Sequence, residues 1–269
     1  MKLSKDHKKH IIKLIIFVLL LFLLFVLIKI NYKDAERKKS LGNTLSDIAT
    51  LNNNQIFSID KIYLYSSADA VNNNQNSVLD LNIYQYTDIA IYISSSSDKT
   101  DESTIKELYI DNIQFDTLES GSSNLYYKNI LDFGKFNLNP GNRIVDRLTY
   151  NVLPVTNTDI DYSKPEVYSN LSNSINLEYL NLIKSNYLIS DVENPVTYNG
   201  SLLKRCGITL NSIANSVSFK IHIKNNLDEL HTATVRIDIP LKDDANSKSI
   251  YDGDISKELK NTINFVCEK

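Results

Sequence analysis

The sequence predicts an all-β protein: an antiparallel β-sandwich, Ig-like or jelly-roll-like, preceded by one N-terminal transmembrane helix. Three observations lead to this prediction. They are an unbroken apolar run near the N-terminus, an apolar/polar alternation of period two from Ile56 onward, and polar turn sequences between the alternating segments. A chain of 269 residues with 42% hydrophobic and 23% charged residues also has the composition of a folded protein.

The apolar run occupies residues 11–30, IIKLIIFVLLLFLLFVLIKI. At a helical rise of 1.5 Å per residue it spans about 30 Å, the thickness of the hydrocarbon core of a bilayer. A cleaved signal peptide is the alternative, but the charged sequence NYKDAERKK that follows offers no small-residue cleavage site. We therefore expect an uncleaved signal anchor, with the lipid bilayer as its partner.

The flanks of this run do not decide its orientation, because five basic residues stand on each side of its apolar centre. A signal anchor this close to the start, followed by a large domain, favours a cytoplasmic N-terminus. We therefore expect a short basic cytoplasmic tail at 1–10, a charged juxtamembrane stalk at 31–52, and an extracytoplasmic domain at 53–269. Apolar residues at helical spacing predict a short helix in the stalk: Leu41, Leu45, Ile48 and Leu51.

Alternation is clearest between Val217 and Leu241, where two alternating runs flank the loop NNLDELH and predict an antiparallel hairpin. The stretch from Val78 to Ser94 alternates in the same way. Two further strands change parity midway, near Asp60 and near Asp111, which predicts a β-bulge in each.

Weaker strand patterns lie near residues 125–136, 144–153 and 175–189, which gives roughly eight to ten strands in all. We favour one sandwich domain, with two stacked sandwiches divided near 154–165 as the alternative. At the C-terminus Ile255, Leu259 and Ile263 are spaced as on a short helix.

Charge and motifs exclude several functions. The first 40 residues hold 10 of the 29 basic residues and 3 of the 32 acidic ones, so the remainder is strongly acidic and is not expected to bind nucleic acid. The spacing of the 7 glycines permits neither a dinucleotide fingerprint nor a P-loop. His222 and His231 are the histidines beyond the first ten residues, and we expect both to be solvated at the surface.

Weak candidates for calcium ligands are Asp252, Asp254 and Glu258, in an acidic stretch near the C-terminus. Asp254 could equally cap the predicted C-terminal helix. Tyr84, Tyr86 and Tyr92 share one parity of their strand and could form an aromatic recognition strip. The favoured alternative is that these tyrosines are covered by another strand of a two-sided sandwich.

Cys206 and Cys267 are an even count in an exported domain, which permits one disulfide. Cys267 could instead be a buried thiol, since it follows Ile263, Phe265 and Val266. A catalytic role for either is not expected, because no histidine is near in the sequence.

These observations assign no catalytic residues and no cofactor apart from the calcium alternative. The leading hypothesis is a non-enzymatic, single-pass membrane protein that acts as a binding or structural subunit at the cell envelope. Its expected partner is another envelope protein or a cell-wall component. Two alternatives stay open: an extracytoplasmic hydrolase acting on cell-wall or carbohydrate polymers, and a calcium- or ligand-binding surface module.

Overall fold

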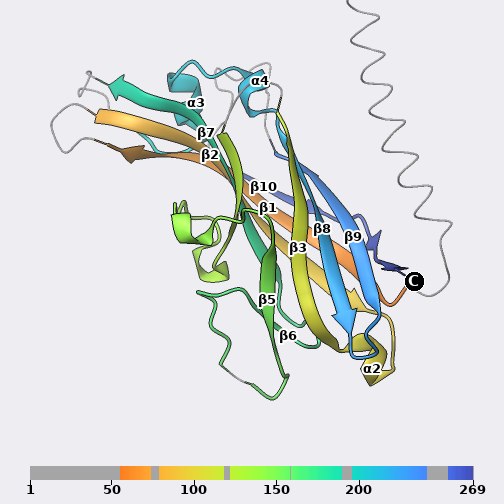
Figure 1. Ribbon diagram of the computed structural model, residues 1–269. Coiled ribbons are helices and arrows are strands. Elements are labelled where there is room, and N and C mark those ends of the chain that lie inside the picture. Colours follow the sequence, from red (N-terminus) through yellow and green to blue (C-terminus); the bar gives the residue numbers. More distant parts are fainter. Residues whose placement is uncertain are drawn as a thin grey trace, which may run out of the picture. The chain divides into compact units, whose positions relative to one another are not determined.

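Two β-sheets account for most of the described chain in the computed structural model (Figure 1). The structure describes residues 55–73, 79–117, 122–157, 159–189, 196–240 and 254–268. All of them belong to one compact unit, Asn54–Lys269.

Sheet A has the strand order β10-β1-β2-β7-β4, with β11 also paired to β1. Its strands are β1 (Phe57–Asn72), β2 (Leu79–Ser95), β4 (Ser122–Tyr127), β7 (Ile175–Ile189), β10 (Ile255–Leu259) and β11 (Ile263–Asn264). Sheet B has the order β12-β9-β8-β3-β5-β6. Its strands are β3 (Ile105–Asp116), β5 (Leu148–Leu153), β6 (Glu166–Tyr168), β8 (Ser216–Asn225), β9 (Leu230–Asp238) and β12 (Val266–Glu268).

Along the strands of both sheets apolar side chains alternate with polar ones, and the apolar side chains of the two sheets pack together in one main core. Ile89 and Ile91 of β2, for example, are fully buried with Phe219 and Ile221 of β8. The described strands are paired antiparallel except for β5 and β6, which are parallel. The all-β, sandwich-like prediction is therefore confirmed.

Several local predictions are confirmed as well. The hairpin is formed by β8 and β9, in register from Ser216↔Asp238 to Lys224↔Leu230. The β1–β2 register shifts between Ile59 and Lys61, and the β3–β8 register shifts between Asp111 and Gln114, where the two bulges were predicted.

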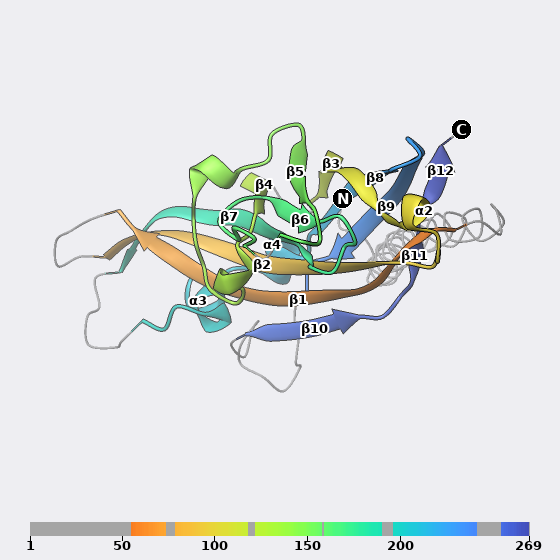
Figure 2. The ribbon, with the colours of Figure 1, turned by 90° about the horizontal axis from the view of Figure 1, so that it is seen from below.

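The predicted C-terminal helix is wrong. Ile255 and Leu259 belong to β10 and Ile263 to β11, and both strands pair with β1 (Figure 2). A helix of nine residues is only marginally stable by itself. The unpaired backbone N–H and C=O groups at the edge of β1, in contrast, can form hydrogen bonds with another strand.

Strands β1, β2 and β7 continue past the main core to an end covered by two short helices, α3 (Gly200–Arg205) and α4 (Leu210–Ile213) (Figure 1). There a second apolar cluster forms around Leu81, Ile83, Leu202 and Leu203. A third short helix, α2 (Thr100–Ser103), connects β2 to β3.

A layer of buried polar side chains separates the two apolar clusters of sheet A. Gln85 Nε2 donates to the Ile213 carbonyl at 3.1 Å, and Asn181 Nδ2 donates to Gln85 Oε1 at 3.4 Å. In the same layer Thr87 Oγ1 donates to Ser66 Oγ at 2.9 Å. These buried groups are thus connected by hydrogen bonds, which offsets much of the cost of removing them from water.

The predicted tail at 1–10, anchor at 11–30 and stalk at 31–52 all lie outside the described residues. Within the part of the chain that the structure describes, no helix is both long and apolar enough to cross a bilayer.

Candidate functional site

The outer face of sheet A is covered by the segment that follows β4. This segment contains two single-turn 3-10 helices, η1 (Ile130–Asp132) and η2 (Pro140–Asn142). Phe136 and Leu138 pack there against a small cluster of Tyr86, Tyr126 and Leu180. The cover turns sharply at Gly134, whose φ of 83° lies in the left-handed region that favours glycine.

Three charged side chains are buried beneath this cover. Asp88 on β2 and Glu178 on β7 are cross-strand partners, and Lys128 follows β4 directly. Lys128 Nζ lies 3.1 Å from Asp88 Oδ1 and 3.1 Å from Glu178 Oε1. The side chains of Lys128, Asp88 and Glu178 are only 2%, 0% and 2% exposed, so this is an ion cluster shielded from water.

Backbone groups of the cover complete the cluster. The Gly134 N–H donates to Asp88 Oδ2 at 2.6 Å, and Lys128 Nζ donates to the Lys135 carbonyl at 2.5 Å. The Asn137 N–H donates to the Glu178 carboxyl. Asp88 Oδ1 is an exception, because its 3.1 Å contact with Lys128 Nζ is an ion pair without an aligned hydrogen bond.

Burial dominates the acidity of the two carboxyls. It raises the pKa of Asp88 to about 6, although the Lys128 charge acts in the opposite direction. Burial also raises the pKa of Glu178 to about 8, opposed by Lys128 and reinforced by the negative charge of Asp88. Near neutral pH one of the two carboxyls therefore keeps its proton, and the two groups share a hydrogen bond.

A polar network extends from this cluster toward β10. Tyr86 Oη donates to the Gly134 carbonyl at 3.4 Å, and Ser67 Oγ donates to Asp254 Oδ1 at 2.5 Å. Between them Tyr65 bonds to both Tyr86 and Asp254, and burial together with Asp254 raises the pKa of Tyr65 to about 12. The cover is thus linked through side chains to the opposite edge of sheet A.

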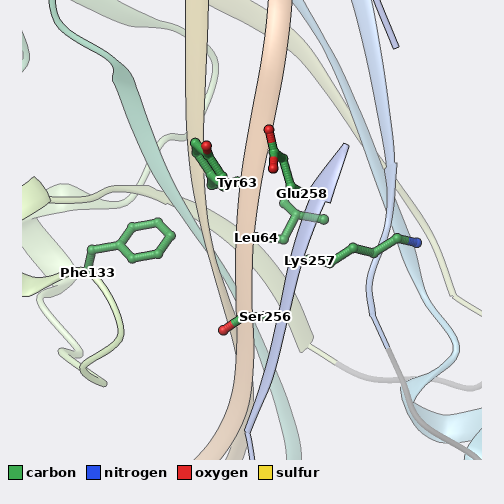
Figure 3. Close-up of a pocket in the computed structure, with 6 residues that line it drawn as sticks. All are labelled: Tyr63, Leu64, Phe133, Ser256, Lys257 and Glu258. Atoms are coloured by element: carbon green, nitrogen blue, oxygen red, sulfur yellow. The ribbon is translucent and has the colours of Figure 1, made fainter. Parts of the chain in front are cut away.

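A shallow pocket of about 320 Å³ lies beside this network. Its lining comes from β1, β10 and the cover: Tyr63, Leu64, Phe133, Ser256, Lys257 and Glu258 (Figure 3). Phe133 precedes Gly134, whose N–H is bonded to Asp88, so the buried cluster helps to fix one wall of the pocket. Next to the pocket, Lys61 Nζ lies 4.8 Å from the ring centroid of Tyr92, and the Tyr63 and Tyr92 rings are 5.7 Å apart.

The three tyrosines of the predicted strip do share the outer face, but they are not one continuous surface. Tyr86 is buried, and the half-buried Tyr84 packs against Phe136 with ring centroids 5.4 Å apart. Tyr92 lies beyond the cover, beside Tyr63 and Lys61. None of the three lines the pocket, and Tyr92 contacts its lining residue Tyr63.

The calcium candidates do not converge within the described residues, where no group of three or more metal-ligating side chains occurs. Asp254 accepts a hydrogen bond from Ser67 and caps no helix, and Glu258 Oε2 lies 3.7 Å from Lys260 Nζ. Asp252 lies outside the described residues.

No disulfide joins Cys206 and Cys267. Cys206 is buried at the end of α3, in the second apolar cluster, where burial raises the pKa of its thiol. Cys267 is exposed on β12, so the buried cysteine is Cys206 and not Cys267.

The expectation of two solvated histidines is wrong. His222 has the polar parity that the sequence indicated, but it is 8% exposed, stacks on Tyr109 and bonds to Asp111 at 2.9 Å. His231 lies within β9 on the core face, 1% exposed, with its ring edge-on to Phe57 at 5.1 Å. The loop between β8 and β9 is shorter than the sequence suggested, which draws His231 into the strand.

The buried ion cluster was not predicted from the sequence. The available signal was weak: Asp88 is the one charged residue between Asn82 and Ser97, and Glu178 is the one between Val167 and Ile183. If both faces of such a strand are covered, its single carboxyl is buried. A buried carboxylate is stable only when it is paired with a cation or hydrogen-bonded.

Together the fold and this site define a class: an all-β, two-sheet protein with a shielded amine–dicarboxyl cluster under one sheet cover. Comparison with protein-family models, with curated proteins and with solved structures finds no match to the chain.

Proposed function

We propose that this protein is a single-pass, membrane-anchored module at the cell envelope, with its β-sandwich outside the cytoplasm, and that it works by binding another envelope protein rather than by catalysis. The apolar run at 11–30 supports the anchor. An Ig-like or jelly-roll-like arrangement of the two sheets is part of the same proposal.

The observation that carries the proposal is the pocket on the outer face of sheet A. Its aromatic walls, Tyr63 and Phe133, are flanked by Lys257 and Glu258 at the edge strand β10, and the pocket is shallow rather than enclosed (Figure 3). Aromatic residues surrounded by charged ones are typical of protein–protein contacts, where one projecting side chain of the partner fills a depression. An enclosed cavity would instead favour a small molecule.

The hydrolase alternative receives less support from this geometry. Glycoside hydrolysis needs two carboxyls that reach the substrate from opposite sides. The close carboxyl pair at Asp88 and Glu178 is sealed from solvent, with side chains 0% and 2% exposed. That pair cannot contact a polymer unless the cover opens.

The binding proposal can be tested with a photo-crosslinking amino acid in the full-length protein in its own membrane. With the probe in place of Tyr63, we expect an ultraviolet-dependent adduct of higher mass, weakened by Phe133→Asp. The matched control carries the probe at Leu227, which is 49% exposed and lies between β8 and β9 of sheet B, whereas the pocket is lined by β1, β10 and the cover. Equal adducts at both positions, or none at Tyr63, would contradict a specific contact.

Topology requires a separate measurement. Protease added to intact cells should degrade the domain while leaving a cytoplasmic marker protein whole. Protection of the domain until the membrane is permeabilised would contradict the extracytoplasmic assignment, whatever the outcome of cross-linking.

A further inference from the structure

The buried cluster places a primary amine in contact with a carboxyl group where water is excluded. From this geometry we propose that Lys128 and Asp88 become joined by an intramolecular amide bond between Nζ and Cγ, with Glu178 as the catalytic acid–base group. The inference concerns a covalent modification site and does not depend on the proposed binding function.

Proximity is the first support. Lys128 Nζ lies 3.1 Å from Asp88 Oδ1, an oxygen bonded to the Cγ that the amine would attack, and the fold holds both groups from separate parts of the chain. Well-oriented groups of this kind reach effective molarities of about 10⁵–10⁸ M. An amine and a carboxyl that never condense in dilute solution can therefore condense in such a site.

The protonation state is the second support. Proton transfer from the Lys128 ammonium to the Asp88 carboxylate gives a neutral amine, which is the nucleophile, and a neutral acid, which is the electrophile. Burial favours this exchange, because desolvation penalises ions and leaves neutral groups largely unaffected. Glu178 stays protonated during the exchange, since burial raises its pKa to about 8.

The step balances without any co-reactant. Nζ attacks Cγ of the Asp88 carboxylic acid, a C–N bond forms, and the carbonyl oxygen takes up negative charge. The C–O bond to the hydroxyl then breaks, and the hydroxyl leaves as water with one proton from the nitrogen. An amine and a carboxylic acid thus become one amide and one water, and no atom is oxidised or reduced.

Glu178 is placed to move these protons. Its Oε1 lies 3.1 Å from Lys128 Nζ, and its carboxyl is hydrogen-bonded to that of Asp88. It can donate to the developing oxyanion, receive the proton from nitrogen and return it to the leaving hydroxyl, ending as it began. The Gly134 N–H, 2.6 Å from Asp88 Oδ2, is a second donor for the oxyanion.

The same contacts select Asp88 over Glu178 as the carboxyl that is joined. Asp88 Oδ2 is held by a backbone donor, as an oxyanion would be, whereas Oδ1 has no aligned hydrogen bond and is the oxygen that can leave. Amide formation removes this orphaned oxygen and replaces a buried ion pair by a neutral group, which lowers the cost of burial.

The test is peptide mass mapping of the full-length protein purified in detergent. We expect a branched peptide that joins the segments around Lys128 and Asp88, lighter than the sum of its parts by one water, with no tryptic cleavage after Lys128. Lys135→Arg is the matched control, because Lys135 is nearby but 71% exposed, and it should keep the link. Lys128→Arg and Asp88→Ala should abolish it.

Two near-isosteric variants test the linkage with little change to the buried cluster. Asp88→Asn should form the same branched peptide by losing ammonia in place of water. Glu178→Gln should lower the linked fraction after a fixed time by at least about tenfold, as expected for loss of a general acid–base group. Its folding is checked by circular dichroism.

Unlinked Lys128 and Asp88 in the folded wild-type protein would overturn the proposal. So would a branch at Glu178, or a water loss confined to a cyclised Asp88, both of which the fragment spectra distinguish. Full linkage in folded Glu178→Gln would remove Glu178 as the catalytic group.

Discussion

Asp88 and Glu178 stand directly opposite each other in the β2–β7 pair, and both are buried beneath the segment that follows β4. Two carboxyls in this position cannot both be ionised at low cost, so their proton content changes with pH close to neutrality. Lys128 contacts both carboxyls, so their protonation also determines whether its amine can react with Asp88.

The pH dependence of linkage follows from Glu178. Its pKa of about 8 means that the carboxyl loses its catalytic proton as the pH rises through that value. We expect linkage to become about tenfold slower for each pH unit above 8, because the protonated fraction falls by that factor. The measurement is mass mapping at timed intervals after refolding the unlinked chain from inclusion bodies into detergent. A rate that rises steadily with pH would contradict this role.

The stability of the folded protein should also depend on pH, through His231. Burial lowers the pKa of His231, and neither ring nitrogen has a hydrogen-bond partner among the described residues. At His231 the unfolded chain therefore binds a proton more readily than the folded one, so the contribution of this residue to the free energy of unfolding falls as the pH is lowered through about 6.5. Thermal unfolding of the wild type and of His231→Phe between about pH 5 and pH 7.5 isolates this contribution. The variant should lose less stability than the wild type as the pH falls, and identical slopes would exclude a contribution from His231.

Ile221 on β8 tests the main core. Its side chain is fully buried, whereas the neighbouring Lys220 points to the other face of sheet B and is half-buried. Ile221→Ala should lower the free energy of unfolding by about 2–5 kcal/mol, and Lys220→Ala by about 0.5 kcal/mol or less. Denaturant titration of both variants makes the comparison. Similar losses in the two would contradict the assigned faces of β8.

The two cysteines should react at very different rates. Cys267 is exposed, whereas Cys206 is buried and burial raises the pKa of its thiol, so Cys206 is both inaccessible and poor in thiolate. A maleimide reagent should modify one thiol quickly in the folded protein and the second only after denaturation. Cys267→Ser should remove the fast phase. Loss of the slow phase in that variant would reverse the assignment.

Features set by local alternation could be predicted from the sequence. The β8–β9 hairpin and both bulges follow from the parity of residues that are close along the chain, such as Phe57, Ile59 and Ile62. The C-terminal strands could not be predicted in this way, because Ile255, Leu259 and Ile263 fit a helix equally well until β1 is known to need an edge partner.

The buried ion cluster could not be predicted from the sequence for a related reason. Asp88 has the parity that a solvated strand face would give it, and nothing near it in the sequence indicates that residues 128–138 lie over that face. The three members of the cluster come from β2, the end of β4 and β7, so only the assembled sheet brings them together.

The polar layer at Gln85, Thr87 and Asn181 fixes the alignment of the longest strands. A shift of β2 along β7 by two residues would keep every side chain on its own face, so alternation alone does not oppose it. Such a shift would carry the amides of Gln85 and Asn181 away from the Ile213 and Ser212 carbonyls and into apolar surroundings. These side chains therefore favour one register of β2 against β7 over registers shifted by two residues. Strands of 15 to 17 residues thereby reach a single alignment during folding.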